Sequence, residues 1–431
     1  MFFIMENWAG NVKWTPQEVL LPKSEEEIAD IIKRATSSGK SIRTVGSHHS
    51  FTPLLATNSV SLSLDEMQGL ISKEPNNRAI AWSGTKLKRL SEELADNGLA
   101  LENMGDINVQ SVAGAISTGT HGTGITLGSV GTQVEEITFV NGLGELITLN
   151  EENNYHEFKC AQLSLGSLGV ITRMKMRCKE AYNLELDIRK EKLSDVLANL
   201  DKIVDENRHF EFYSIPNSQW SQTKRSNIVG EKAGHTSKFS AFINDIVLEN
   251  WALQLLCSIN KAIPSSSKTI SNLIGSFISN EKKVQQSHKV FSTVRNVKFT
   301  EMEYNIPYES YQEVVKEMLK LIDKNNYRIS FPQEHRFVQA DDIYLSPAHN
   351  RNSAYIASHV YKGMENTRYF KDLEDLFVAH GGRPHWGKMH TRDASFFRKA
   401  YPKFDDFLQV RAKHDPNGIF LNDHLKKVFG V

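Results

Sequence analysis

Two groups of side chains in this sequence have the types and the spacing that chemistry requires. The first is the pair Glu334 and Arg336, which are two residues apart, so on a strand both side chains face the same side. A buried carboxylate and guanidinium stay charged only when they pair with each other or with a bound polar molecule. The pair therefore indicates a polar binding site, and the alternative is an ordinary ion pair at a sheet surface.

The second group is the turn Gly46-Ser47-His48-His49-Ser50, which follows a strand-like run at residues 41–46. Such a turn offers clustered main-chain donors together with two imidazole rings. In extended geometry adjacent histidines face opposite sides, so we do not expect one metal ion to be held by both. An exposed or merely hydrogen-bonded histidine pair is the alternative.

A glycine-rich stretch follows about sixty residues later. Nine of the 26 glycines lie between Gly105 and Gly144, and no Lys or Arg occurs from residue 90 through residue 158. Glycine admits left-handed backbone, so successive main-chain N–H groups can hold phosphate oxygens without a cation. The stretch predicts a neutral cradle for a diphosphate, and a glycine-rich surface loop is the alternative. It lacks the Rossmann glycine spacing, and the GxxxxGK match at residues 382–388 has Met389 where a hydroxyl is required.

Hydrophobic periodicity and turn signals predict the elements that must position these residues. Helices are expected at 25–38, 85–97, 194–207, 308–325 and 366–380. Strands are expected at 41–46, 59–64, 79–84, 170–178, 209–215, 330–338, 342–345 and 354–361, with a hairpin at 137–149. Residues 236–292 are predicted to form a helical insert that is interrupted near Pro264.

Length and charge limit the class of protein. A chain of 431 residues is long enough for two or three domains. It carries 51 basic and 51 acidic residues, so its formal net charge is zero and we expect neither a nucleic-acid partner nor a membrane partner. Three cysteines form neither a disulfide framework nor a metal-ligand spacing, and no export signal is recognised, so a cytoplasmic protein is expected.

Taken together and in order, several motifs resemble the vanillyl-alcohol oxidase / p-cresol methylhydroxylase family of flavoproteins, and within it the aldonolactone and alditol oxidase branch. The resemblance spans nearly the whole chain, except for a middle segment from about 216 to 300. The motifs that carry it are residues 43–51 (RTVGSHHSF), 111–122 (SVAGAISTGTHG), 166–171 (GSLGVI), 334–336 (EHR), 384–388 (PHWGK) and 415–418 (DPNG).

The resemblance implies an α+β, two-domain flavoprotein fold. An FAD-binding domain would comprise residues 1–180, with segment 385–431 returning to it, and a substrate (cap) domain would comprise residues 181–384. The residue joined covalently to the flavin 8α-methyl group would be His49, with His48 at a position that is often glycine in relatives. Further FAD contacts would be Gly46, Ser47, His48, Ser50, Ser111, Gly114, Ser117, Gly119, Thr120, His121, Gly122, Val170, Ile171, His385 and Lys388.

The implied reaction is the oxidation of an alcohol group of a polyol or aldonolactone to a carbonyl, with hydride passing to flavin N5 and electrons to O2, which gives hydrogen peroxide. The implied catalytic residues are Lys388, Glu334 and Arg336, with His359 and Ser111 as further substrate contacts. One alternative is a dehydrogenase of the same branch with another electron acceptor. An alternative of a different class is a hydrolytic metal centre without flavin, built from His48, His49, His121, His385 and His390.

Overall fold

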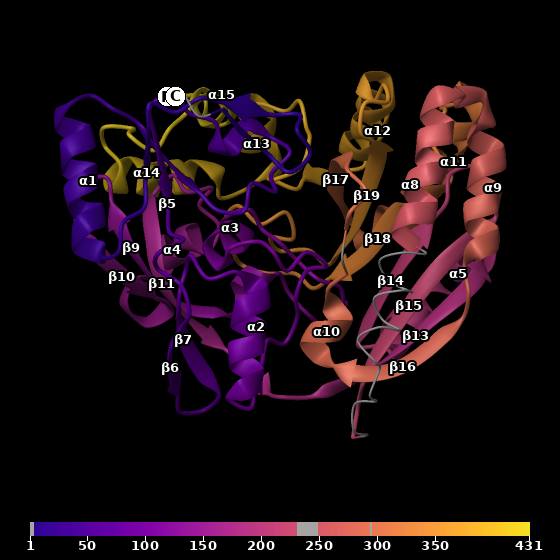
Figure 1. Cartoon of the computed structure of the whole chain (residues 1–431), viewed down its shortest axis with the longest axis horizontal. Helices are drawn as coiled ribbons and strands as arrows, with labels where there is room; N and C mark the ends of the chain where they lie inside the picture. The colour runs from indigo at the N-terminus through magenta and orange to yellow at the C-terminus, as the bar shows by residue number, and fades with distance from the viewer. Residues whose placement is uncertain (1–3, 231–248, 294) are drawn as a thin grey trace.

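The structure is a computed structural model that describes residues 4–230, 249–293 and 295–431. In its first part, two sheets are covered by short helices (Figure 1). The larger sheet is antiparallel and runs in the order β10 (Leu146–Asn150), β9 (Val134–Asn141), β11 (Gly169–Arg177), β7 (Arg78–Trp82) and β6 (Leu70–Glu74). The smaller sheet is parallel, in the order β3 (Glu18–Leu20), β5 (Val60–Ser63) and β4 (Ile42–Val45). The helices are α1 (Glu25–Ser37), α2 (Leu87–Asp96), α3 (Val112–Ser117) and α4 (Glu151–Ala161).

Helix α1 shows how the local sequence sets these elements. The Ser24 side chain accepts a hydrogen bond from the Glu27 amide, which caps the helix at its first turn. Ile28, Ile32 and Ala35 then fall on one buried face. The prediction of a helix over 25–38 is confirmed.

The second part of the chain is built on one eight-stranded sheet. Its order is β16 (Glu281–Gln286), β13 (Asn183–Lys192), β15 (Trp220–Val229), β14 (His209–Ser214), β18 (Gln333–Val338), β19 (Ser353–Tyr361), β17 (Phe299–Pro307) and β20 (Arg383–Pro384). One face is covered by α5 (Leu193–Ala198), α6 (Leu200–Glu206), α11 (Tyr311–Asn325) and α12 (Thr367–Ala379), whose apolar side chains share a core with the strands. The other face is polar and is described below.

The C-terminal helices return to the first part of the chain. These helices are α13 (Ala394–Ala400), α14 (Phe404–His414) and α15 (Asp423–Phe429). Phe397, Phe407 and Leu425 belong to the same hydrophobic cluster as Phe139 of β9 and Phe158 of α4. The α+β, two-domain fold class is confirmed.

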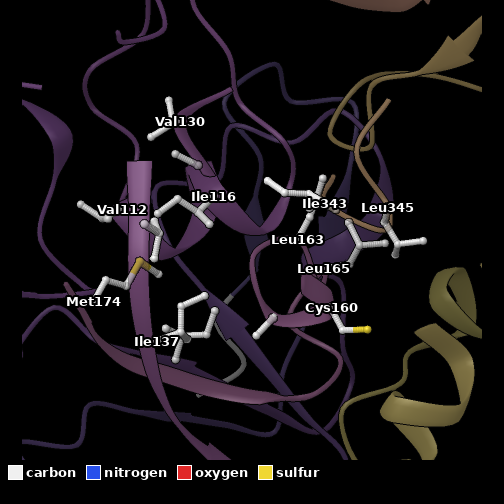
Figure 2. Packing of buried hydrophobic residues seen from close by; sticks show 14 of the residues in the cluster. Val112, Ile116, Val130, Ile137, Cys160, Leu163, Leu165, Met174, Ile343 and Leu345 are labelled. Carbon is white, nitrogen blue, oxygen red and sulfur yellow. The ribbon is translucent and has the colours of Figure 1, made fainter. Parts of the chain in front are cut away.

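Residues 342–345 were predicted to form a strand, and that prediction was wrong. They lie in a turn in which the Asp341 carboxylate accepts hydrogen bonds from the Ile343 amide and the Ser346 hydroxyl. Ile343 and Leu345 are apolar because they are buried in the first domain's core, where Figure 2 shows them beside Leu163. Burial alone produced the strand-like pattern.

Two other predicted elements differ from the structure. The single helix expected at 194–207 is interrupted at Asn199, which separates α5 from α6. The insert contains α8 (Glu249–Ala262), α9 (Ser267–Phe277) and α10 (Ser287–Phe291), but residues 281–286 form the edge strand β16 against β13. Part of the predicted insert, residues 231–248, lies outside the described residues. Short pairs β1 (Met5–Glu6) with β2 (Lys13–Trp14) and β8 (Leu99–Ala100) with β12 (Lys179–Glu180) complete the fold.

Candidate active site

The face of the eight-stranded sheet that lies opposite α5, α6, α11 and α12 carries charged side chains. Along β17, Glu301 and Glu303 point to this face, because side chains alternate along a strand, while Met302 and Tyr304 point into the apolar core on the other side. The same alternation on β18 places Glu334 and Arg336 on the polar face. These four charged residues are all at most 7% exposed.

A first cluster forms around the two carboxylates of β17. The Lys388 Nζ atom lies 2.5 Å from a carboxylate oxygen of Glu301 and 3.9 Å from one of Glu303. The His359 Nε2 atom lies 3.5 Å from Glu301, and the His121 Nε2 atom lies 3.0 Å from Glu303. Three segments that are far apart in the sequence thus meet at one buried pair of acids.

Main-chain hydrogen bonds hold the loop that carries Lys388. The His385 amide donates to the Glu303 carbonyl oxygen at 2.9 Å, and the Met389 amide donates to the Glu301 carbonyl oxygen at 3.0 Å. The loop therefore continues the edge of β17, and the lysine between these two bonds is aimed at the strand's carboxylates.

Both carboxylates are held in their ionised form. Burial alone would raise the pKa of Glu301, but Lys388 and His359 lower it to about 2. Burial is likewise outweighed at Glu303, where His121 and Lys388 hold the pKa well below its usual value. Burial lowers the pKa of His385 to about 4, so this ring is neutral at neutral pH. The cluster therefore holds the Lys388 ammonium group against two ionised carboxylates.

A second cluster surrounds Glu334 and Arg336. The Arg336 guanidinium donates to Glu334 at 2.8 Å and to Glu211 of β14 at 2.9 Å. The Tyr213 hydroxyl donates to Glu334, and Arg295 lies 3.1 Å from the Tyr213 oxygen. Burial, then Glu211 and Glu334, raise the pKa of Tyr213 well above its usual value, so it remains a donor. Glu334 and Arg336 are both buried, so the alternative of an ordinary ion pair at a sheet surface is excluded.

The register of the sheet fixes the spacing of the two clusters. Glu303 of β17 and Glu334 of β18 each pair with Ala357 of β19. The three residues therefore lie in one row across three neighbouring strands. Two strand spacings separate the acids by roughly 10 Å. Hydrogen-bonding groups of opposite charge thus lie on both sides of the small Ala357 side chain. This arrangement suits the binding of a molecule with several hydroxyl groups.

The glycine turn after β4 carries the two adjacent histidines. His48 has a φ of 56°, so the turn is left-handed there and the expectation of extended geometry was wrong. The rings still diverge, since His48 meets the edge of Trp14 at 5.2 Å between ring centroids and His49 stacks on Trp8 at 5.7 Å. Burial, then Lys388, lower the pKa of His49 to about 4, which leaves a neutral, nucleophilic ring at neutral pH.

A pocket of about 880 Å³, including its open mouth, lies beside this turn. Its wall includes nine of the residues predicted to contact FAD, namely Gly46, Ser47, His48, His49, Ser50, Ser111, Gly114, Ser117 and Ile171. Ser111 caps α3 by accepting a hydrogen bond from the Gly114 amide, and it is not among the contacts of either charged cluster described above.

The other predicted contacts lie outside the wall of this pocket. His121, His385 and Lys388 belong to the first charged cluster. Val170 is buried in a hydrophobic cluster. Gly119, which has a φ of +78°, and Thr120 connect α3 to His121. Gly122 packs closely against Asn103, because a Cβ on Gly122 would lie 2.2 Å from the Asn103 Oδ1 atom.

The pocket's chemistry fits a flavin dinucleotide. A Cβ on Gly46 would lie 2.3 Å from the Ser111 Oγ atom, so the missing side chain lets the turn lie close against the Ser111 hydroxyl that caps α3. The prediction of a cation-free cradle was wrong, because Arg43 and Lys86, which precede the glycine-rich stretch, line the pocket. However, Arg43 donates to main-chain carbonyl oxygens, and Lys86 pairs with Asp65 at 2.8 Å. Main-chain and hydroxyl groups remain for phosphate oxygens.

The five histidines of the metal-centre alternative do not form one group, although the His121 and His385 rings are neighbours at 5.9 Å between centroids. His48 and His49 face different tryptophans, and the His390 ring packs against Phe397. Among the residues that the structure describes, no group of three or more His, Cys, Asp or Glu side chains is arranged to hold a metal ion.

Sequence reasoning missed several members of the two clusters. Glu301 and Glu303 could have been found, since the run Thr-Glu-Met-Glu-Tyr carries the same two-residue spacing as Glu334 and Arg336. Asp106 and Arg295, which pair with each other beside Tyr213, lie in loops without a recognisable pattern. Only the folded chain brings these two loops together.

The family model of D-arabinono-1,4-lactone oxidase matches residues 174–428, and the model of an FAD binding domain matches residues 16–150. An L-gulono-1,4-lactone dehydrogenase of Mycobacterium tuberculosis is 35% identical over 428 residues, covering 99% of each chain. An L-gulonolactone oxidase of Bos taurus is 30% identical, covering 98% of each chain.

Solved structures also resemble this fold. Cholesterol oxidase from B. sterolicum superposes with a TM-score of 0.86 over 100% of this chain and 97% of the other, at 16% sequence identity. At that identity the likeness concerns the fold alone.

Proposed function

The chain belongs to the D-arabinono-1,4-lactone oxidase family of FAD-dependent oxidoreductases, and from this premise we propose that it oxidises an alcohol group of an aldonolactone to a carbonyl. The observation that carries the proposal is the buried row of charges from Glu303 to Glu334, with Lys388 against Glu301 and Glu303. Relatives named for gulonolactone and arabinonolactone support a sugar lactone as the substrate class.

The two clusters have different tasks in this proposal. Glu334 and Arg336 hold the substrate's hydroxyl groups, because a carboxylate accepts and a guanidinium donates in fixed directions. Lys388 donates to the reacting oxygen, and the proton that the hydroxyl group loses passes to the polar cluster that Lys388 forms with Glu301 and Glu303. His359 positions Glu301 at 3.5 Å, and Ser111 is proposed as a further substrate contact.

The cofactor's proposed seat is the pocket beside the glycine turn. Gly46, Ser47, Ser50, Gly114 and Ser117 would hold its diphosphate, and His49 would carry the covalent bond to the flavin. When bound, FAD accepts the hydride from the substrate carbon and passes the electrons on to an acceptor. The neutral His49 ring supports this attachment, because a protonated imidazole is no nucleophile.

We propose O2 as the acceptor, with hydrogen peroxide as the second product, because a relative over nearly the whole chain is named an oxidase. A dehydrogenase with a different acceptor is the second candidate, and the mycobacterial relative's name favours it. A cytoplasmic location is proposed from the three cysteines, which are free and buried.

Anaerobic mixing of the purified holoenzyme with a panel of aldonolactones and alditols tests the reaction. We expect the yellow colour to bleach with at least one aldonolactone and to return on admission of air, with one peroxide formed per turnover. Bleaching without reoxidation by air would instead identify a dehydrogenase. Absence of bleaching with every member of the panel would contradict the proposed reaction.

The covalent bond is tested by a matched pair of variants, His49→Ala and His48→Ala. Acid precipitation of the His48→Ala protein should leave the yellow colour with the polypeptide, as in the unmodified chain. The His49→Ala protein should lose all covalent flavin, because the adjacent His48 ring packs against Trp14 and does not replace His49. Retained covalent colour in His49→Ala would assign the bond to another residue.

A further inference from the structure

One ion pair beside the second charged cluster joins the two parts of the chain. Asp106 lies in the loop between β8 and α3, and Arg295 lies in the loop between α10 and β17. The Arg295 Nε atom donates to the Asp106 Oδ2 atom at 3.0 Å, and the Arg295 Nη2 atom donates to the same oxygen. The tasks proposed above for the two clusters do not include this pair.

Further hydrogen bonds fasten the two loops to each other. The Thr293 hydroxyl donates to the Asp106 Oδ1 atom at 2.7 Å, and the Thr293 amide donates to the Asp106 carbonyl oxygen at 3.2 Å. The Asn108 side-chain amide donates to the Ser292 hydroxyl at 3.0 Å. Two of these three bonds do not use the Asp106 side chain, so the contact between the loops does not depend on the charge of Asp106.

The guanidinium of this pair also reaches the residues that are proposed to hold the substrate. The Arg295 Nη2 atom donates to the Tyr213 oxygen at 3.1 Å, and the Tyr213 hydroxyl donates to Glu334. The same Nη2 atom lies 3.9 Å from the Glu334 Oε1 atom, which is beyond hydrogen-bond distance. The Arg295 guanidinium thus lies between two carboxylates and is hydrogen-bonded to Asp106 but not to Glu334.

Both carboxylates are buried, which makes their competition for the guanidinium strong. Asp106 is 6% exposed and Glu334 is 7% exposed. Burial alone would raise the pKa of Asp106, but the Arg295 guanidinium holds this pKa well below its usual value, so Asp106 is ionised. An unpaired buried charge is costly. If Asp106 lost its charge, a shift of roughly 1 Å would therefore bring Arg295 into a hydrogen bond with Glu334.

We propose that Asp106 is a positioning residue for substrate binding, which retains Arg295 at Tyr213 and so keeps an acceptor position of Glu334 open for a substrate hydroxyl group. The inference rests on the proposed function, in which Glu334 binds such hydroxyl groups. A guanidinium bound to Glu334 would occupy lone pairs that the hydroxyl group needs, and the substrate would have to displace it. The loss would fall on binding, because the pocket proposed for the cofactor is not lined by Asp106.

The variant Asp106→Asn of the full-length holoenzyme tests this role. Asparagine keeps an oxygen that accepts from the Thr293 hydroxyl, but it lacks the charge that holds Arg295. Anaerobic stopped-flow reduction of the flavin by an aldonolactone gives the substrate Kd and the limiting reduction rate separately. We expect Kd to rise by about tenfold or more, which is the order of one hydrogen bond to a charged group, and the limiting rate to change by less than about twofold.

A double variant and a matched control complete the design. In Asp106→Asn/Arg295→Met the competing guanidinium is absent and no buried charge is left unpaired, so Kd should return to within about threefold of the unmodified value. The control is Glu102→Gln. Glu102 lies in the same loop as Asp106, but it pairs with Arg208 at 3.2 Å and with Lys179 at 3.3 Å. Its replacement should leave Kd within about twofold.

Flavin content and thermal unfolding show whether each variant is folded. An unchanged Kd in Asp106→Asn would overturn the proposal, as would an equal rise in Glu102→Gln or a fall in the limiting rate alone. If Asp106→Asn does not retain flavin, the double variant decides. A Kd raised tenfold or more in that variant would make Arg295 itself a substrate contact and would refute the role given to Asp106.

A crystal structure of the Asp106→Asn holoenzyme separates this proposal from the proposed function. We expect the Arg295 guanidinium within hydrogen-bond distance of Glu334. If Arg295 instead stays at Tyr213, the role of Asp106 is refuted, whichever substrate the enzyme oxidises. Absence of flavin reduction in the unmodified holoenzyme with every aldonolactone would contradict the proposed function, and the position of Arg295 in the crystal would still decide the role of Asp106.

Discussion

Lys388 determines the charge balance of the first cluster. Two buried carboxylates, Glu301 and Glu303, lie within 4 Å of this one ammonium group, and both remain ionised because of it and the adjacent histidines. The Lys388 Nζ atom also lies 5.3 Å from the centre of the Phe51 ring, next to the glycine turn. The residue thus links the carboxylates of the sheet to the segment that carries His49.

Replacement of this lysine should therefore remove turnover and spare cofactor binding. For Lys388→Met we expect kcat to fall by about a hundredfold or more, the magnitude typical of losing a donor to a developing oxyanion. Covalent flavin content should stay normal. Lys403→Met is the matched control, because Lys403 also forms an ion pair, with Asp406, at an exposed site. Steady-state rates measure the fall in kcat, and flavin absorbance measures the cofactor content. Near-normal turnover of Lys388→Met would remove Lys388 from the mechanism.

Site residues could be predicted from the sequence where a local pattern of residue types points to them. The two-residue spacing placed Glu334 and Arg336 together, and the structure pairs them. The glycine turn pointed only to two adjacent histidines, and the resemblance chose His49 between them. The resemblance supplied Lys388, His121 and His359 but not Glu301 and Glu303, the two acids that they contact, because only the register of the sheet brings these acids to the other three residues. Lys86 lies before the glycine-rich stretch, so the absence of cations within that stretch did not predict the charge of the pocket wall.

At the scale of elements, β19 separates the active site from the core. Ala357 points to the polar face between Glu303 and Glu334, whereas Ala354 points to the opposite face and belongs to the hydrophobic core. Both alanines are at most 1% exposed. The same substitution at the two positions therefore probes two different functions of one strand.

Enlarging each alanine in turn should separate catalysis from stability. Ala357→Leu is expected to push the flanking carboxylates apart and to lower kcat/KM by about tenfold or more, since small misplacements of reacting groups are costly. Ala354→Leu should leave kcat/KM within about twofold and should lower stability by about 1–3 kcal/mol, the usual cost of overpacking a core. Kinetics and urea unfolding of both variants test this, and equal kinetic losses would refute the division.

Element prediction succeeded where amphipathic pattern and packing agree. Helix α1 carries its own cap and a single buried face, so the sequence determines its bounds. Residues 342–345 mislead because a turn can be buried as fully as a strand. Strand β16 was missed because its sequence is polar, and it pairs with β13 through main-chain hydrogen bonds and the Lys282–Glu185 ion pair. In both cases tertiary contacts outweigh the local pattern.

Several histidines of the described residues are held as neutral rings by burial. Outside the proposed site, burial lowers the pKa of His209 and His390 to about 4 and that of His335 and His424 to about 3. His335 shows the reason, since it is fully buried and stacked on Phe212, with the Ser214 and Tyr311 hydroxyls at its two nitrogens. Protonation would place a charge where both partners are neutral.

These histidines should therefore lower stability in mild acid, before most carboxylates titrate, whereas Asp341, whose pKa burial raises to about 7, acts in the opposite direction. The unfolded chain binds protons at these histidines near pH 6.5, whereas the folded chain does not until about pH 4, so each proton favours unfolding across that interval. At about pH 5 each such histidine costs up to about 2 kcal/mol relative to neutral pH. We expect the urea midpoint of the holoenzyme to drop between about pH 7.5 and about pH 5, and to drop less in His335→Gln when each protein is referenced to its own value at pH 7.5. A midpoint that stays level until the carboxylate range below about pH 4.5 would show that these rings are not what makes the fold sensitive to acid.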